Sequence, residues 1–342
     1  MRITHLLSVA LLATTSIVWA GPEKDLSGNA IFDQPNKQID FGKLKYFKKS
    51  DTILVPFVEV KLQNWGTQGV VAETGGFGSK TQTAQARSTL ASSVDPKIAQ
   101  DLATKIHKDL IESMRAEGWN VITFDDVKDT KAYQKLKWEK DEELGQGIKV
   151  EKKDGKFMGV GMADSSGNGF IIAVPEGQQF LKYGITGPAW AMRKVVKAEK
   201  VNLFIPTYTI NTMYFAAEGK KSLFGDRASA EVSSGPLVSL GNVTAYYLNP
   251  KLAGSGMAFK EKAYGKNTGV AGGKLVSAKD TSPKAANALG AVFRAVGGAG
   301  IQKNSSERVI ESNDAEVEAE ALKLAGAYND VIARASALYK GK

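Results

Sequence analysis

Few side chains in this sequence could carry out catalysis. The chain has two histidines and no cysteine, which excludes a thiolate nucleophile and a cysteine-ligated zinc. One histidine lies in an N-terminal segment that we expect to be removed, so a Ser-His-Asp triad would depend on His107. That residue is flanked by lysines on a predicted amphipathic helix, where a solvated or boundary position accounts for it. We therefore predict no catalytic residue, no metal site and no cofactor.

Three glycine-rich segments approach known motifs without matching them. Residues 75–81 read GGFGSKT, but Ser79 separates the last glycine from the lysine that follows it directly in a phosphate-binding loop. Residues 159–161 read GVG and lack the third glycine of a dinucleotide fingerprint. Residues 254–256 read GSG, which falls short of a G-x-S-x-G nucleophile motif. We interpret the first segment as a loop and the other two as turns.

Paired carboxylates are the remaining candidates for chemistry. Asp125 and Asp126 follow a predicted strand, and residues 141–143 read DEE. Two suitably spaced carboxylates could hydrolyse a glycosidic bond, which keeps a carboxylate-dependent glycan hydrolase as one alternative. The interpretation without chemistry makes Asp125 and Asp126 helix-capping residues and 141–143 a solvated charged turn.

Basic residues point to a binding surface. The formal charge is +9, and residues 251–310 hold ten Lys or Arg against three Asp or Glu. Such a stretch could contact anionic lipid headgroups or acidic glycans. Nucleic acid is a disfavoured partner, because only three aromatic residues are interleaved with these cations. The candidate anion contacts are Lys260, Lys262, Lys266 and Lys274, and a solvated lysine surface is the alternative.

The N-terminus has the layout of a cleavable secretory signal. Met1-Arg2 precedes an apolar run at 6–19, and small residues precede the expected cleavage after Ala20. The run is shorter than the roughly 20 residues that cross a bilayer, so an uncleaved anchor is the weaker interpretation. Since no cysteine can carry a lipid, we expect an exported protein that is periplasmic, outer-membrane-associated or secreted, and not lipid-anchored.

Alternating strands and helices must position these residues. The Thr52–Val60 segment is β-branched and apolar, as in a strand. Asp95-Pro96 begins a helix whose apolar residues recur every fourth position and which ends at Gly118. We predict a loop or weak hairpin at 66–93, strands at 119–124, 170–174, 201–215, 229–232 and 242–248, and helices at 126–140, 188–197 and 282–298.

With 342 residues, 43% of them hydrophobic, the chain is long enough to fold around its own cores. The alternation predicts an α/β fold with a mixed β-sheet covered by helices, a strand-rich second half and a long C-terminal helix. The expected organisation is a signal peptide (1–20), an N-terminal arm (21–50), an α/β domain (51–250), a Gly/Ala/Lys-rich extension (251–310) and the C-terminal helix (311–342).

The C-terminal helix carries an unbroken heptad pattern. Asn313 or Ser312 caps it, acidic residues fill its first turns and basic residues its last, as the helix dipole favours. The apolar seam packs either against the protein's own sheet or against a neighbouring subunit. Its interface candidates are Val317, Leu324, Tyr328, Val331 and Leu338.

The order of these elements resembles a known envelope domain. Residues 55–60 (VPFVEV), 101–127 (DLATKIHKDLIESMRAEGWNVITFDDV) and 201–215 (VNLFIPTYTINTMYF) look like the α/β domain shared by the curli secretion channel subunit and the N-terminal domain of TolB-like envelope proteins. The resemblance covers about residues 50–250. It implies a non-catalytic subunit or accessory of an envelope assembly or secretion apparatus. The channel family's lipid-anchoring cysteine is missing here, the 251–310 stretch has no counterpart, and no site residue carries over.

We therefore expect an exported, non-enzymatic cell-envelope protein that acts by binding or self-assembly. Its expected partners are envelope proteins or further copies of itself, with anionic lipid or glycan as additional candidates. A second alternative beside the hydrolase is a pore-forming protein, in which residues 66–93 make an amphipathic β-hairpin that rearranges in a membrane.

Overall fold

The computed structural model describes residues 39–40, 50–74, 82–139, 144–151, 166–184, 187–221, 228–259, 271–274, 278–280, 301–338 and 340. The predicted signal peptide, most of the predicted N-terminal arm and the predicted helix at 282–298 lie outside them. Within them the strands form one 13-stranded mixed sheet. The fold is α/β, with a mixed sheet, a strand-rich second half and a long C-terminal helix.

Parallel pairs occupy the middle of the sheet. Strand β2 (Thr52–Leu54) pairs in parallel with β5 (Asn120–Ile122) and with β8 (Asn202–Lys221), and β8 pairs in parallel with β3 (Glu59–Thr74). Residues 53–54 of β2 and 203–205 of β8 are all apolar and buried, as expected for parallel strands that are covered on both faces.

Antiparallel strands extend the sheet. Strands β4 (Gln82–Ser92) and β7 (Ser166–Ala173) pair with β3, and β9 (Ala228–Leu248) pairs with β8. Strands β10 (Gly254–Phe259) and β11 (Ala271–Lys274) pair with β9, and β6 (Ile148–Glu151) pairs with β7. The remaining strands are β1 (Ile39–Asp40), β12 (Ala278–Asp280) and β13 (Ile301–Ser312).

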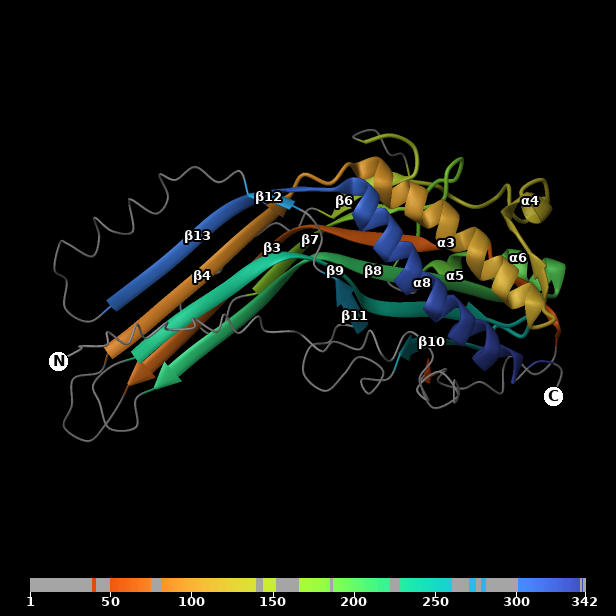
Figure 1. The fold of residues 1–342 in the computed structure, drawn as a ribbon. Helices are drawn as coiled ribbons and strands as arrows, with labels where there is room; N and C mark the ends of the chain where they lie inside the picture. Colours follow the sequence, from red (N-terminus) through yellow and green to blue (C-terminus); the bar gives the residue numbers. More distant parts are fainter. Residues whose placement is uncertain are drawn as a thin grey trace, which may run out of the picture.

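Two long helices cover one face of this sheet (Figure 1). Helix α3 (Pro96–Ala116) begins where the Asp95 side chain accepts a hydrogen bond from the Lys97 backbone N–H. Its predicted stripe, including Leu102 and Leu110, is buried. Helix α8 (Asp314–Ala337) begins at Asn313, as predicted. The two helices share one apolar core with the sheet.

Short helices and turns cover part of the other face. Helices α4 (Phe124–Val127), α5 (Gly187–Ala191) and α6 (Arg193–Glu199) surround a second core that contains Phe57, Phe180 and Val195. We call the part of the sheet that these helices cover, together with the helices themselves, the body.

Strand β3 changes its partner partway along its length. At 60–62 it pairs with β7 and β8 at once, so these two strands lie on opposite edges of β3. At 65–68 it pairs with β7 and β4 at once, so β4 lies on the edge that β8 held. Beyond residue 62, β4 therefore replaces β8 beside β3.

Three sequence predictions about local structure were wrong. The strands predicted at 229–232 and 242–248 form the single strand β9. The predicted helix at 126–140 is only the four-residue α4 followed by turns. Its later backbone groups pair elsewhere, since the Glu139 N–H donates to the Phe180 carbonyl and the Lys182 N–H to the Lys137 carbonyl. Residues 254–256, predicted as a turn, belong to β10, where they pair with β9.

A buried polar network fixes α8 to the body. The Tyr208 hydroxyl on β8 donates to Asn329 Oδ1 on α8. Asn329 Nδ2 in turn donates to Asp109 Oδ2 at 2.7 Å and to the Ile106 carbonyl at 3.3 Å, both on α3. Asn329 is fully buried, so these bonds replace all of its contacts with water.

The substitution Asn329→Ala should destabilise the body by about 1–3 kcal/mol, because it leaves the buried Tyr208 hydroxyl without its hydrogen-bond partner. Urea unfolding followed by circular dichroism measures this loss. Lys323→Ala on the same helix, whose side chain is 56% exposed, should change stability by less than about 0.5 kcal/mol. Equal effects of the two substitutions would contradict the role of the network.

Candidate functional site

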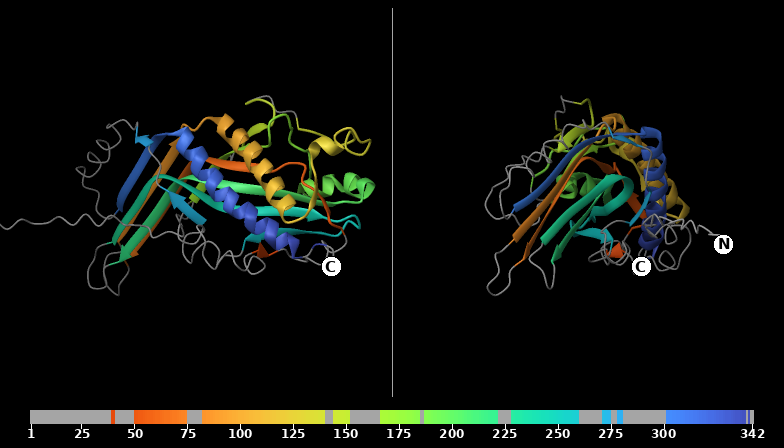
Figure 2. Two further views of the ribbon diagram at one scale, coloured as in Figure 1. Left: turned by 45° about the vertical axis from the view of Figure 1, so that its right-hand side comes forward. Right: turned by 60° about the vertical axis from the view of Figure 1, so that its left-hand side comes forward.

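Long strands project beyond the ends of the two covering helices (Figure 1). The first hairpin consists of residues 65–74 of β3 and all of β4. The second hairpin consists of residues 211–221 of β8 and 228–236 of β9. We call these two hairpins, together with β13 beside β4, the arm. This arm is distinct from the predicted N-terminal arm at 21–50. Both further views show it leaving the same end of the body (Figure 2).

The first hairpin has two different faces. On β4, Ala84, Ala86, Ser88 and Leu90 are buried, whereas Gln85, Arg87 and Thr89 between them are partly exposed. The register places Ala72 opposite Ala84 and Val70 opposite Ala86, so the buried face continues onto β3. Because side chains alternate along a strand, one face is small and apolar and the other is polar.

Strand β9 of the second hairpin repeats this alternation, whereas residues 212–213 of β8 are both buried and 217–219 are all exposed. Met213 on β8 and Ala230 on β9 are buried. Ser229, Glu231 and Ser233, which flank Ala230 and Val232 on β9, are exposed.

The apolar faces of the two hairpins are stacked on each other. Ala72, Ala84 and Ala86 of the first hairpin form one cluster with Ala230 of the second. A second cluster nearer the body joins Leu90 of β4 with Met213 of β8 and Ile310 of β13. The contact side chains are mostly small, so the stack buries much less apolar area per residue than the body core does.

Polar bonds hold the stack together as well. Ser88 Oγ on β4 and Ser234 Oγ on β9 are 2.7 Å apart. Arg308 on β13 donates through Nη2 to the Ser234 carbonyl at 2.7 Å and to its Oγ at 2.6 Å. Strand β13 therefore pairs with the first hairpin through its backbone and with the second through a side chain.

A buried carboxyl group lies in the body, at the first residue of β3. Glu59 is 8% exposed, and its carboxylate accepts a hydrogen bond from Thr207 Oγ1 at 3.5 Å. Burial raises the pKa of this carboxyl group, while Lys149 and Lys61 nearby act in the opposite direction. Lys149 is itself held by Glu139 at 2.7 Å.

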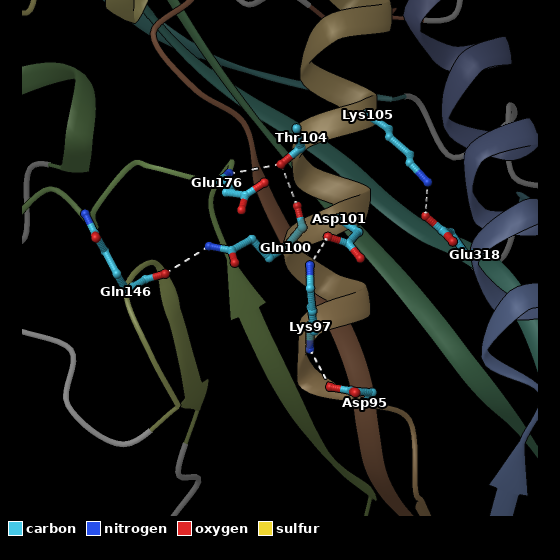
Figure 3. Close-up of polar contacts among 9 residues, drawn as sticks. All are labelled: Asp95, Lys97, Gln100, Asp101, Thr104, Lys105, Gln146, Glu176 and Glu318. Carbon is cyan, nitrogen blue, oxygen red and sulfur yellow. Dashed lines mark hydrogen bonds and ion pairs between the residues drawn. The ribbon is translucent and has the colours of Figure 1, made fainter.

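The carboxylates near the start of α3 have structural partners (Figure 3). Lys97 Nζ lies 2.7 Å from Asp101 Oδ1, and Lys105 on α3 contacts Glu318 on α8. Thr104 Oγ1 accepts a hydrogen bond from the Glu176 backbone N–H at 3.0 Å. Gln100 Nε2 donates to the Gln146 carbonyl at 2.9 Å. These contacts join α3 to its neighbours, and we assign them no chemistry.

The candidate anion contacts fall mostly outside the described residues. That holds for Lys260, Lys262 and Lys266. Lys274 has its backbone in β11, in register with Val238 of β9. The candidate anion contacts therefore stay a prediction.

The seam of α8 faces the chain's own core. Four of the five interface candidates are at most 2% exposed, and Leu338 is 42% exposed. The four are Val317, Leu324, Tyr328 and Val331, and they pack with α3 and the sheet. This packing favours the intramolecular interpretation of the heptad pattern.

The other sequence candidates have structural roles where they are described. His107 Nε2 lies 2.9 Å from the Val55 carbonyl, and burial lowers the pKa of its imidazole. His107 is buried rather than solvated, which corrects our expectation for this helix position. Asp126 Oδ2 accepts from the Thr123 N–H and hydroxyl, which lowers the pKa of that carboxyl. Asp126 thus caps α4, as predicted, whereas residues 141–143 lie outside the described part.

Only part of the arm was predicted from the sequence. A weak hairpin at 66–93 was one of two interpretations, but neither the second hairpin nor β13 was recognised as part of a joint feature. The available signal was the alternation of small apolar with polar residues in 84–90, which a loop does not require.

The substitution Glu59→Gln should stabilise the protein by roughly 1 kcal/mol at pH 8. Because the folded-state pKa is raised, the protonated carboxyl favours folding below the unfolded-state pKa, and that contribution is lost as pH rises through the folded-state pKa. The gain should therefore shrink toward pH 5. Urea unfolding at both pH values tests this, with the exposed Glu231→Gln as control. A gain in stability that does not depend on pH would contradict the raised pKa of Glu59.

In the described part of the chain no group of three or more His, Cys, Asp or Glu side chains could hold a metal ion. Among the same residues, no helix has the length and apolar character needed to span a membrane. Comparison with known proteins gave no matching family model, no matching curated protein and no matching solved structure.

Proposed function

We propose that the protein is an exported, non-enzymatic component of the cell envelope that acts by self-assembly through its arm. The two-faced alternation of the first hairpin and of β9, with the small apolar faces stacked, supports this proposal more than any other observation. The predicted signal peptide and the absence of a recognisable catalytic motif in the sequence agree with it.

The edges of the hairpins support assembly as well. Beyond Gln68, β3 has a strand partner on one edge only among the described residues, and so does β8 beyond Ile210. Unpaired strand edges present rows of N–H and C=O groups that another strand can join. Within the described residues, the arm therefore offers more pairing capacity than one copy uses.

A pore is the form of assembly that the arm favours. A strand needs about 9–11 residues to cross a bilayer at a tilt, and β4 has 11. Strands in membrane pores alternate between lipid-facing apolar residues and lumen-facing polar ones, as β4 and residues 229–233 of β9 alternate between buried and more exposed residues. Because every backbone group must be paired in lipid, an isolated four-stranded sheet cannot span it. Several copies would have to join, so assembly and pore formation are one event.

A charge on the apolar face should block this event. In Ala86→Glu a carboxylate replaces a methyl group that would face lipid in every copy, so we expect leakage of calcein from phosphatidylglycerol-containing liposomes to fall about tenfold or more. Light scattering should show fewer oligomers in the same samples.

The matched control is Gln85→Glu, one residue away on the polar face, which should leak like the unsubstituted protein. Near-ultraviolet circular dichroism should show that the body of both variants is folded. Liposomes that stay intact with the unsubstituted protein would contradict the pore, and a protein that also stays monomeric would contradict assembly.

A further inference from the structure

Strand β13 differs from the other strands of the arm in how it pairs. Residues 301–310 of β13 lie parallel to residues 83–92 of β4, whereas both hairpins are antiparallel. Parallel pairing is slightly weaker per residue. The register also puts Gln302 opposite Ala84 and Asn304 opposite Ala86. Polar residues of β13 are therefore paired with the small apolar residues of β4, which are buried.

The edge of β4 that β13 occupies is the edge directed toward β8. Strand β7 holds the far edge of β3, and β4 and β8 follow one another along the near edge. Strand β8 is parallel to β3 and β4 is antiparallel to it, so β4 and β8 run in opposite directions. The edge of β8 beyond Ile210 has no strand partner among the described residues. The two edges are therefore compatible with an antiparallel ladder.

We propose that this edge of β4 is the pairing surface for β8 of the same chain, and that β13 is a displaceable strand that fills it before assembly. When β13 leaves, the stacked hairpins move side by side into one antiparallel sheet in the order β3, β4, β8, β9. The apolar faces that covered each other then lie on one side of that sheet. The inference rests on the proposed function, because lipid is what replaces the lost stack.

Several contacts hold the end of β13 that lies near the body. Near the body, the Ser93 N–H donates to the Ile310 carbonyl at 3.0 Å, and Ser92 Oγ lies 2.8 Å from Ser312 Oγ. The side-chain bonds of Arg308 to Ser234 also lie in this part. Val309 beside it is 46% exposed. Loss of the Arg308 bonds should therefore loosen β13 from the second hairpin.

Engineered disulfides test the displacement, since the chain has no cysteine of its own. Gln85 pairs with Lys303 of β13 on one side and with Val71 of β3 on the other. Neighbouring strands are about 4.8 Å apart, which suits a disulfide between facing residues. The double variant Q85C/K303C locks β13 onto β4, and V71C/Q85C is the matched control that closes only the first hairpin.

The oxidised Q85C/K303C variant should leak calcein at least about tenfold more slowly than the control, and dithiothreitol should restore leakage. Arg308→Ala should leak faster than the unsubstituted protein. Leakage of the locked variant at the control's rate would overturn the proposal.

Hydrogen exchange separates this inference from the proposed function. On addition of liposomes, amides of 301–309 should exchange at least about tenfold faster, while those of 83–92 stay protected by their new partner. Unchanged protection of 301–309 overturns the displacement, whether or not the protein leaks. Faster exchange at 301–309 without leakage would support displacement and contradict the pore. Exposure of 83–92 together with 301–309 would overturn pairing with β8.

Discussion

Strand β3 has two edges, and three strands pair with them. Strand β7 takes one edge over residues 60–68, so β8 and β4 must share the other. Once β4 takes over at residue 65, β8 can no longer lie beside β3, and the second hairpin has to find another position. It stacks on the first one, with the small apolar faces together. The shape of the arm follows from this competition for one row of backbone hydrogen bonds.

The body and the arm are held together with different strength. The body buries large side chains such as Tyr208, Phe57 and Leu62, and its helices are fixed by the network through Asn329. The arm buries alanines and serines between its hairpins. Since the free energy of burial grows with apolar area, the arm is the part that can rearrange while the body keeps its fold.

The same alternation serves both states of the arm. In a single copy in water, the apolar faces cover one another and the polar faces meet solvent. In lipid the apolar faces would gain an apolar environment without stacking, and the hydrogen bonds of the strand edges would become the dominant requirement. Water therefore favours face-to-face packing of the hairpins, and lipid favours edge-to-edge pairing. Strand β13 lies at the edge where these two arrangements differ.

Local signals in the sequence determined the local elements. Asp95-Pro96, Asn313 and the apolar stripe of α3 specify helices through contacts within a few residues, and the structure confirms those helices. The fold class followed from the same alternation of elements. The tertiary structure alone decided the rest. The heptad seam of α8 suits either a neighbouring subunit or the chain's own sheet. In the structure the seam packs against α3 and the sheet of the same chain. Strand β13 is polar and has no apolar pattern that predicts a strand. Its pairing depends instead on an edge of β4, which lies more than 200 residues earlier in the chain. Backbone hydrogen bonds between distant polar strands leave no residue-specific pattern in the sequence, so the sequence alone does not predict them.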